Sequence, residues 1–188
     1  MSRIEISVMD SEAEQIRLSK QNARALLEGK KINEARRAFK DISRQQPTDA
    51  EAWHFLGVCN GLLGMRLEAE DCFRQSIINH SPSAHTYHNL ALLLMEHGRL
   101  DEAADNFREA ISLKPDFVSA HIGLGTVFEK KRDFLEAAAT YERAIVTTGE
   151  SGDLFNRLGQ VYKELKQHDR AEYNYRQTIR LRPNHARG

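Results

Sequence analysis

Three histidines are the first candidates for chemistry in this sequence. His54 and His88 are 34 residues apart, and His85 lies one helical turn before His88. Imidazole nitrogens bind divalent transition metals, so such a set could in principle hold an ion. No carboxylate or thiolate stands at matching places, and the spacing fits no metal-ligand motif. We therefore interpret the histidines as hydrogen-bonding residues and expect no metal site and no cofactor.

Two other groups of residues resemble reactive motifs but lack the required partners. Gly57, Gly61 and Gly64 form a glycine-rich stretch. No strand precedes it, and it lacks the lysine and hydroxyl residue that end a phosphate-binding loop. Cys59 and Cys72 are too few for a disulfide framework, and small semi-buried thiols are the simpler interpretation. No catalytic set emerges, so we expect the chain not to be an enzyme.

Composition and charge disfavour several other function classes. The 188 residues include 27 Lys+Arg and 27 Asp+Glu, so the formal net charge is zero. General binding to a phosphate backbone then lacks its driving force, and no nucleic-acid partner is expected. No apolar run approaches the roughly 20 residues that span a bilayer, so no membrane association is expected. The first residues lack the apolar core of a secretory signal, which makes the cytoplasm the default compartment.

An internal repeat explains where these residues stand. The segment "EAADNFREAISLKPDF" begins at Glu102, and similar segments begin 34 residues apart along the chain, at 34, 68, 136 and 170. A period of this length indicates a repeat architecture. Rows of 34 residues fit without insertion or deletion. The predicted organisation is a segment 1–15 that contains the start of the first helix, five repeats at 16–49, 50–83, 84–117, 118–151 and 152–185, and the start of a truncated sixth unit at 186–188.

Small and large side chains recur at fixed row positions. Position 8 is small, at Ala23, Gly57, Ala91, Gly125 and Gly159. Position 20 is always alanine, and position 24 is always aromatic, at Phe39, Phe73, Phe107, Tyr141 and Tyr175. Within a row the repeated positions fall at helical spacing, so each row predicts two amphipathic helices. The small residues would let the two helix backbones approach closely, and the aromatic rings would fill the space beside that contact.

Turn and cap signals separate the predicted helices. Proline, which cannot continue a helix interior, closes four rows at Pro47, Pro82, Pro115 and Pro183. A residue suited to an N-cap then precedes the next helix at Asp49, Ser83 and Ser151. Near the start, the run from Ser11 to Glu14 resembles a capping box, so the first helix is expected to begin near Glu12.

The pattern resembles the tetratricopeptide repeat, and the resemblance covers residues 16–185. Two rows depart from it: Ser19 and Asn22 stand where bulky apolar residues are usual, and Gly149 replaces the closing proline. The resemblance implies an all-α fold, an α-α superhelix (solenoid) of antiparallel helix pairs. It also implies that the first helices line a concave groove, that the second helices form the outer face, and that the groove binds a protein or peptide partner.

The residues expected in that groove occupy row positions 2, 5, 6, 9 and 12. The candidate peptide-binding residues at these positions are Lys20, Arg24, His54, Phe55, Val58, His85, His88, Asn89, Leu92, Met95, Ile122, Thr126, Asn156 and Arg157. The middle of the set is apolar with polar residues between, which suits an extended or helical peptide with an apolar anchor. The amide of Asn89 offers a donor and an acceptor to a peptide backbone. The basic end at Lys20 and Arg24 would suit an acidic segment.

The leading functional hypothesis is a noncatalytic protein–protein interaction module, a scaffold or adaptor. The carboxylate clamp of chaperone-binding members is absent, because only Asn89 matches it when it is aligned from row 50–83. No capping element follows Pro183, which motivates two alternatives. One is an N-terminal targeting or substrate-recruiting domain of a larger enzyme, such as a bacterial sulfotransferase or glycosyltransferase. The other is a scaffold that self-associates through its uncapped C-terminal end.

Overall fold

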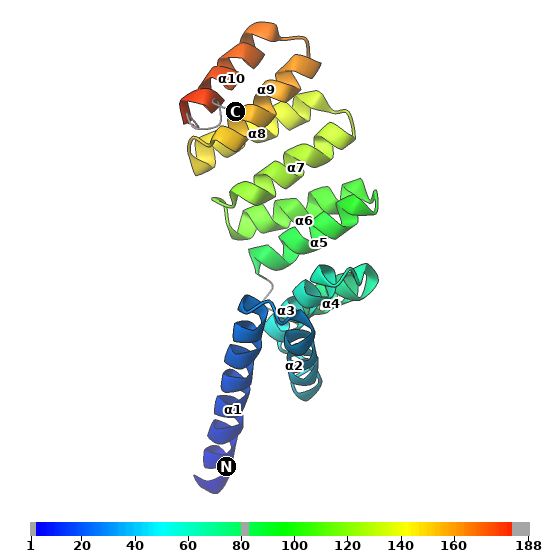
Figure 1. Cartoon of the computed structure of the whole chain (residues 1–188), viewed down its shortest axis with the longest axis vertical. Coiled ribbons are helices and arrows are strands. Elements are labelled where there is room, and N and C mark those ends of the chain that lie inside the picture. Colours follow the sequence, from blue (N-terminus) through cyan, green and yellow to red (C-terminus); the bar gives the residue numbers. More distant parts are fainter. Residues whose placement is uncertain (1–2, 80–82, 182–188) are drawn as a thin grey trace. The chain divides into compact units, whose positions relative to one another are not determined.

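The computed structural model describes the backbone of residues 3–79 and 83–181, and the side chains from residue 13 onward. These residues form helices joined by short connections, with no strand among them (Figure 1). The helices are α1 (Arg3–Glu28), α2 (Ile32–Gln45), α3 (Ala50–Leu62), α4 (Arg66–Ile78), α5 (Ala84–Glu96), α6 (Leu100–Leu113), α7 (Val118–Lys130), α8 (Phe134–Thr148), α9 (Gly152–Glu164) and α10 (His168–Leu181).

The chain divides into two compact units, 1–82 with α1–α4 and 83–188 with α5–α10. Within each unit, successive helices run antiparallel and pack as pairs (Figure 1). The first unit contains the pairs α1/α2 and α3/α4, and the second contains α5/α6, α7/α8 and α9/α10. The predicted fold class, an all-α array of antiparallel helix pairs, is therefore confirmed.

In the pairs α3/α4 and α7/α8, the small and aromatic row positions contact each other as predicted. Gly57 on α3 faces the ring of Phe73 on α4, and a Cβ built at Gly57 would lie 2.7 Å from Cε1 of that ring. A Cβ at Gly125 on α7 would lie 2.3 Å from Cε1 of Tyr141 on α8. Both rings are buried. The absence of a Cβ therefore brings the backbone of the first helix onto the aromatic ring of the second.

The turn inside each pair places one residue in the left-handed conformation at row position 15. Its φ is 76° at Gly64, 75° at Gly98, 58° at Lys30 and Lys166, and 60° at Arg132. Glycine adopts this conformation without strain, whereas a residue with a side chain loses about 1 kcal/mol or more. The left-handed conformation therefore recurs at row position 15 in all five rows, although only two of the rows have glycine there.

The predicted helix starts hold in part. Asp49 caps α3 by accepting a hydrogen bond from the backbone N–H of Ala52 at 2.9 Å, and Ser83 caps α5. Ser151 stands at the N-cap of α9, but its side chain makes no capping hydrogen bond. The expected start near Glu12 is wrong, because α1 begins at Arg3. The alanine and glutamates of the supposed capping box are good helix formers and continue the helix.

Consecutive pairs are joined at the closing prolines. Nε1 of Trp53 donates to the carbonyl of Pro47 at 2.8 Å, and Nε2 of His121 lies 2.9 Å from the carbonyl oxygen of Pro115. Both rings occupy row position 4 and reach back to position 32 of the previous row. The remaining two closing prolines, 82 and 183, and the short segment 186–188 lie outside the described residues.

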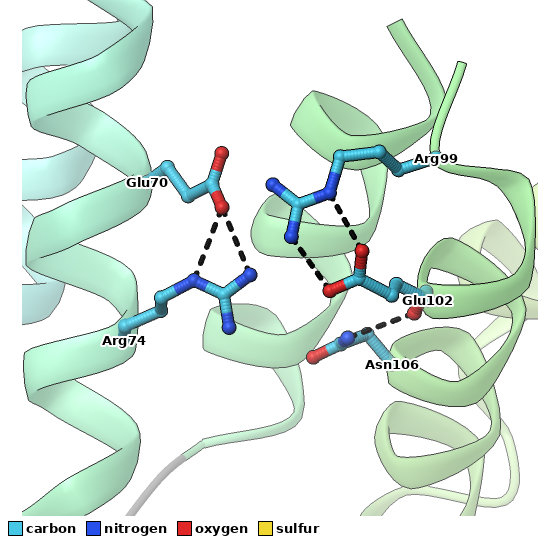
Figure 2. A network of polar contacts seen from close by, with 5 residues as sticks. All are labelled: Glu70, Arg74, Arg99, Glu102 and Asn106. Atoms are coloured by element: carbon cyan, nitrogen blue, oxygen red, sulfur yellow. Dashed lines mark hydrogen bonds and ion pairs between the residues drawn. The ribbon is translucent and has the colours of Figure 1, made fainter. Parts of the chain in front are cut away.

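Arginine–glutamate pairs lie on second helices of both units (Figure 2). On α4, Nε and Nη2 of Arg74 donate to Oε1 of Glu70 at 3.0 and 2.9 Å. At the start of α6, Arg99 binds both carboxylate oxygens of Glu102 at 2.6 Å, and Asn106 donates to the backbone carbonyl of Glu102 at 2.8 Å. Pairs at this spacing stabilise a helix by a few tenths of a kcal/mol each.

Candidate functional site

The candidate residues divide between the two units. Lys20, Arg24, His54, Phe55 and Val58 belong to the first unit, and the others belong to the second. All of them lie on first helices of the pairs, α1, α3, α5, α7 or α9. Arg24 and His85 are exposed, and every other candidate is half-buried. Half-buried side chains can contact a ligand while their inner atoms stay packed against the helix pair.

The two positively charged candidates of the first unit, Lys20 and Arg24, already form ion pairs with carboxylates. Nζ of Lys20 lies 2.8 Å from Oδ2 of Asp49 and 3.1 Å from Oε2 of Glu51, and Arg24 forms an ion pair with Glu51. Both acids stand at the start of α3, where negative charge interacts favourably with the helix N-terminus. An acidic ligand at Lys20 and Arg24 would therefore have to compete with them.

Phe55 is the centre of an aromatic cluster on the same unit. Its ring stacks on Phe39, with centroids 5.1 Å apart and an interplanar angle of 17°. His54 meets the ring of Phe55 edge-on at 5.1 Å, and the Arg24 guanidinium carbon lies 5.3 Å from its centroid. The Phe39 contact fixes one side of Phe55 to the core, and the exposed part of the ring offers a rigid apolar surface.

His85 and His88 pack against an aromatic ring that the sequence analysis did not include. The centroid of Phe117 lies 4.7 Å from that of His85 and 4.9 Å from that of His88, and Phe107 lies 5.5 Å from His88. Burial, with a smaller contribution from His85, lowers the pKa of His88. Its Nδ1 is buried and has no hydrogen-bond partner among the described residues. The neutral ring is therefore favoured here.

The other candidates of the second unit combine apolar side chains with available amides. Leu92 and Met95 lie on α5, Ile122 and Thr126 on α7, and Asn156 and Arg157 on α9. The side-chain amides of Asn89 and Asn156 have no hydrogen-bond partner within 83–181, the described part of this unit. Each amide can therefore donate to and accept from a ligand backbone.

Tyr141 and Glu129 add a polar cluster that the site prediction missed. The Tyr141 hydroxyl donates a hydrogen bond to Glu129 and lies 3.5 Å from Oγ1 of Thr126. Burial, then the hydrogen bond to Glu129, raises the pKa of Tyr141, and the charge of Arg157 acts in the opposite direction. The sequence signal was a tyrosine at position 24 in place of phenylalanine, because a buried hydroxyl needs a partner.

The two cysteine thiols of the first unit have low reactivity. Burial raises the pKa of Cys59 and Cys72 to about 11, so both thiols stay protonated near neutral pH and are poor nucleophiles. In the described ranges, no group of three or more His, Cys, Asp or Glu side chains is placed to hold a metal ion. No described helix is both long enough and apolar enough to span a bilayer.

Comparison with known families gives matches along most of the chain. A family model described as "Tetratricopeptide repeat" matches residues 21–84 and 88–154, and a second model of the same description matches 152–185. The human "Protein O-mannosyl-transferase TMTC3" is 29% identical over 193 residues, which cover 90% of this chain and 21% of the human protein. The chain thus spans about a fifth of the length of the curated relatives it matches.

Two solved structures illustrate the similarity of fold. MamA superposes with a TM-score of 0.80 at 19% identity, over 88% of this chain and 97% of MamA. YrrB, described as "a TPR protein with an unusual peptide-binding site", has a TM-score of 0.77 at 16% identity, over 96% of this chain and 93% of YrrB. At such identities the similarity shows the repeat fold and nothing about the ligand.

Proposed function

We propose that this chain, which belongs to the tetratricopeptide-repeat family, is a noncatalytic module that binds a protein or peptide segment on its first helices. The proposal rests on the half-buried apolar side chains of α5 and α7 together with the unpaired amides of α5 and α9. An extended peptide presents an unpaired backbone N–H and C=O at every residue. Such amides can hold a peptide backbone, while an apolar surface accepts a side chain.

In the second unit, the proposed binding surface has separate apolar and polar parts. Leu92, Met95 and Ile122 supply the surface for an apolar anchor residue of the partner. Asn89 and Asn156 bind the partner's backbone. An anchor that removes water from these groups strengthens the hydrogen bonds made beside it. The peptide class is therefore an extended or helical segment with at least one large apolar side chain.

The first unit supplies a different kind of surface in this proposal. Phe55, His54 and Val58 accept a second apolar side chain. Lys20 and Arg24 contribute only after their carboxylate partners are displaced or shared. We therefore expect acidic residues in the ligand to be a minor determinant of affinity, in contrast to what the basic residues alone suggested.

A peptide array tests the proposal with matched variants. Wild-type chain is compared with His88→Ala/Asn89→Ala/Leu92→Ala and with the control Glu109→Ala/Ser112→Ala, which changes exposed residues of α6. Circular dichroism first verifies equal helicity. Peptides that bind wild type and the control, but not the triple variant, support the proposal. Peptides that bind the triple variant as well as they bind wild type contradict the proposal, and so does an array on which no peptide binds.

A second candidate function places the same module inside a larger enzyme. The similarity to the human O-mannosyl-transferase covers 90% of this chain and favours this alternative. In it, the repeats recruit a substrate protein, and another domain carries out the transfer. Mass spectrometry of the native protein distinguishes the two, because the alternative requires a longer polypeptide with a catalytic domain. A native polypeptide that consists of repeats alone would exclude it.

A further inference from the structure

The second helices leave grooves between them at equivalent row positions. In the first unit, one groove of about 280 Å³ lies between α2 and α4 over α3. In the second unit, one of about 240 Å³ lies between α6 and α8 over α7, and one of about 580 Å³ lies between α8 and α10 over α9. These grooves face away from the candidate residues of the first helices, since second-helix side chains form their walls.

The walls of the α8/α10 groove differ in chemistry from those of its equivalent in the first unit. Row position 29 of the first wall helix and row position 22 of the second wall helix line both of these grooves. They carry Arg44 and Asp71 in the α2/α4 groove but Val146 and Tyr173 in the α8/α10 groove. Val146 is 86% exposed and Tyr173 is 59% exposed. Two large apolar side chains thus stand open to solvent where the other groove has opposite charges.

The floor of the α8/α10 groove is apolar as well. Phe155 and Leu158 of α9 are buried beneath it, and Ile145 of α8 is half-buried at its side. Together with Val146 and Tyr173 they line the same groove. Exposed apolar residues scattered singly are ordinary, but a contiguous set in a concave site marks an interaction surface.

The rim of the groove carries a net negative charge. The Tyr162 hydroxyl donates to Glu142, and the Arg170 guanidinium carbon lies 5.3 Å from the Tyr162 ring centroid. Arg170 is therefore held against the tyrosine beside Glu142. Asp169, in the first turn of α10, has no ion-pair partner among the described residues. Two carboxylates thus face one guanidinium at the rim, and the unpaired one is free to attract a cation.

We propose that the α8/α10 groove is a second docking site, which takes a partner segment with a large apolar side chain next to a lysine or arginine. The apolar side chain enters between Val146 and Tyr173 and packs on Phe155 and Leu158. The basic residue reaches Asp169 at the rim. The volume suits one or two side chains from a chain that passes over the open groove. This site acts independently of the surface on the first helices.

A peptide-display selection tests the site directly. The probe is a library of random twelve-residue peptides, selected on the wild-type chain. The key variant, Val146→Arg/Tyr173→Asp, gives this groove the wall residues of the α2/α4 groove, which the same fold already accommodates. Val146→Ser/Tyr173→Ala, matching Ser112 and Ala139 at the equivalent positions between α6 and α8, is the second variant if the first loses helicity.

The expected result has three parts. Selected peptides contain a large apolar residue beside a lysine or arginine. Their affinity falls at least about tenfold on the groove variant, as for loss of a central contact, and is unchanged on His88→Ala/Asn89→Ala/Leu92→Ala. Replacing the basic residue of the peptide by glutamate weakens binding most at low salt, because salt screens an exposed charge pair.

Other outcomes overturn the proposal. Peptides that bind the first helices are set aside first, because they lose binding to the His88→Ala/Asn89→Ala/Leu92→Ala variant. If the remaining peptides lack the apolar–basic pair, or if none remain, the assigned partner chemistry is wrong. If the groove variants leave the binding of these remaining peptides unchanged, the peptides bind elsewhere on the chain. Sedimentation that shows a wild-type dimer and a monomeric groove variant would assign the groove to a second copy of the chain instead.

Discussion

At the scale of single residues, the missing Cβ of Gly125 determines how closely α7 can approach the ring of Tyr141. The α7 backbone approaches the tyrosine ring more closely than any side chain allows. The ring itself is fully buried, and its hydroxyl is held by Glu129. The ring therefore has little freedom to move aside, and the glycine is a packing residue of the repeat.

Gly125→Ala is expected to lower the free energy of unfolding by roughly 1–3 kcal/mol, because the new methyl group overlaps the Tyr141 ring. Urea unfolding followed by circular dichroism measures this. Gly61→Ala is the matched control, since Gly61 lies in α3 with no atom within 4 Å of its built Cβ. Helix propensity predicts that the control gains up to about 1 kcal/mol. Equal effects at both sites would contradict the packing argument.

His88 makes stability depend on pH below neutrality. Its pKa lies below the ordinary value of 6.5 in the folded chain, mainly because burial disfavours the charged ring. The unfolded chain therefore binds the proton more readily. The neutral His88 ring contributes its full share to the free energy of unfolding above pH 6.5. This contribution is lost as the pH falls through the folded pKa. His88→Phe, which keeps an aromatic ring, should reduce this loss. An NMR titration giving His88 a pKa of 6.5 or more would refute the assignment.

At the scale of helices, caps and turns fix where each element begins and ends. Asp49 illustrates this, because one carboxylate both caps α3 and pairs with Lys20. The two roles have different magnitudes. A lost cap costs about 1 kcal/mol and up to about 2, whereas a partly exposed ion pair contributes between zero and about 1 kcal/mol.

Asp49→Ala is therefore expected to destabilise the chain by about 1–2 kcal/mol, since it removes both roles. Asp49→Asn keeps an oxygen that accepts the Ala52 N–H and loses only the charge. Its cost should stay within about 1 kcal/mol and shrink in high salt. Thermal or urea unfolding of the pair of variants measures the difference. An asparagine variant as unstable as the alanine variant would show that the ion pair, and not the cap, is dominant.

The left-handed turn residues give a second element-level prediction. Gly98→Ala should lower the free energy of unfolding by about 1 kcal/mol, because alanine is strained at a φ of 75°. The cost is conformational, since nothing lies within 4 Å of the built Cβ. Lys166→Gly removes the same strain and should leave stability unchanged or raise it by up to about 1 kcal/mol. Destabilisation by Lys166→Gly would mean that its side chain contributes a contact that outweighs the strain.

Sequence periodicity predicted the helix pairs because their packing demands small and aromatic residues at fixed spacing. It could not predict the left-handed turns at Lys30, Arg132 and Lys166, because glycine is the usual sequence signal for that conformation and is absent at these positions. The start of α1 was also missed. No proline or glycine precedes Ser11 in α1 and good helix formers follow it, so a local capping pattern did not decide the boundary.

The candidate site was predictable only as row positions on first helices. The contacts of Phe117 with His85 and His88 were not predicted. Phe117 stands at the last position of its row, outside the row positions from which the site was predicted. Tyr141 was not predicted as a site residue, because its ring packs in the core and only its hydroxyl reaches Glu129. The partners of Lys20 and Arg24 also depend on how α3 packs against α1, which composition does not reveal.

At the scale of the molecule, the repeat fold is shared with proteins of different names, so specificity must come from surface residues. We assign a partner-binding surface to the first helices of each unit, taken separately. The grooves between second helices remain a separate surface with its own chemistry. The two units contribute different side chains. Those of α1 and α3 are aromatic or ion-paired, whereas the second unit has apolar side chains on α5 and α7 and unpaired amides on α5 and α9.

The most direct test of the central claim is NMR mapping of a peptide recovered from the array. Amide and methyl signals of the wild-type chain are followed during titration. We expect the largest shifts on Asn89, Leu92, Met95 and Ile122, and we expect the His88→Ala/Asn89→Ala/Leu92→Ala variant to show none of them. Shifts confined to α6, α8 and α10, with the first helices unchanged, would contradict binding on the first helices.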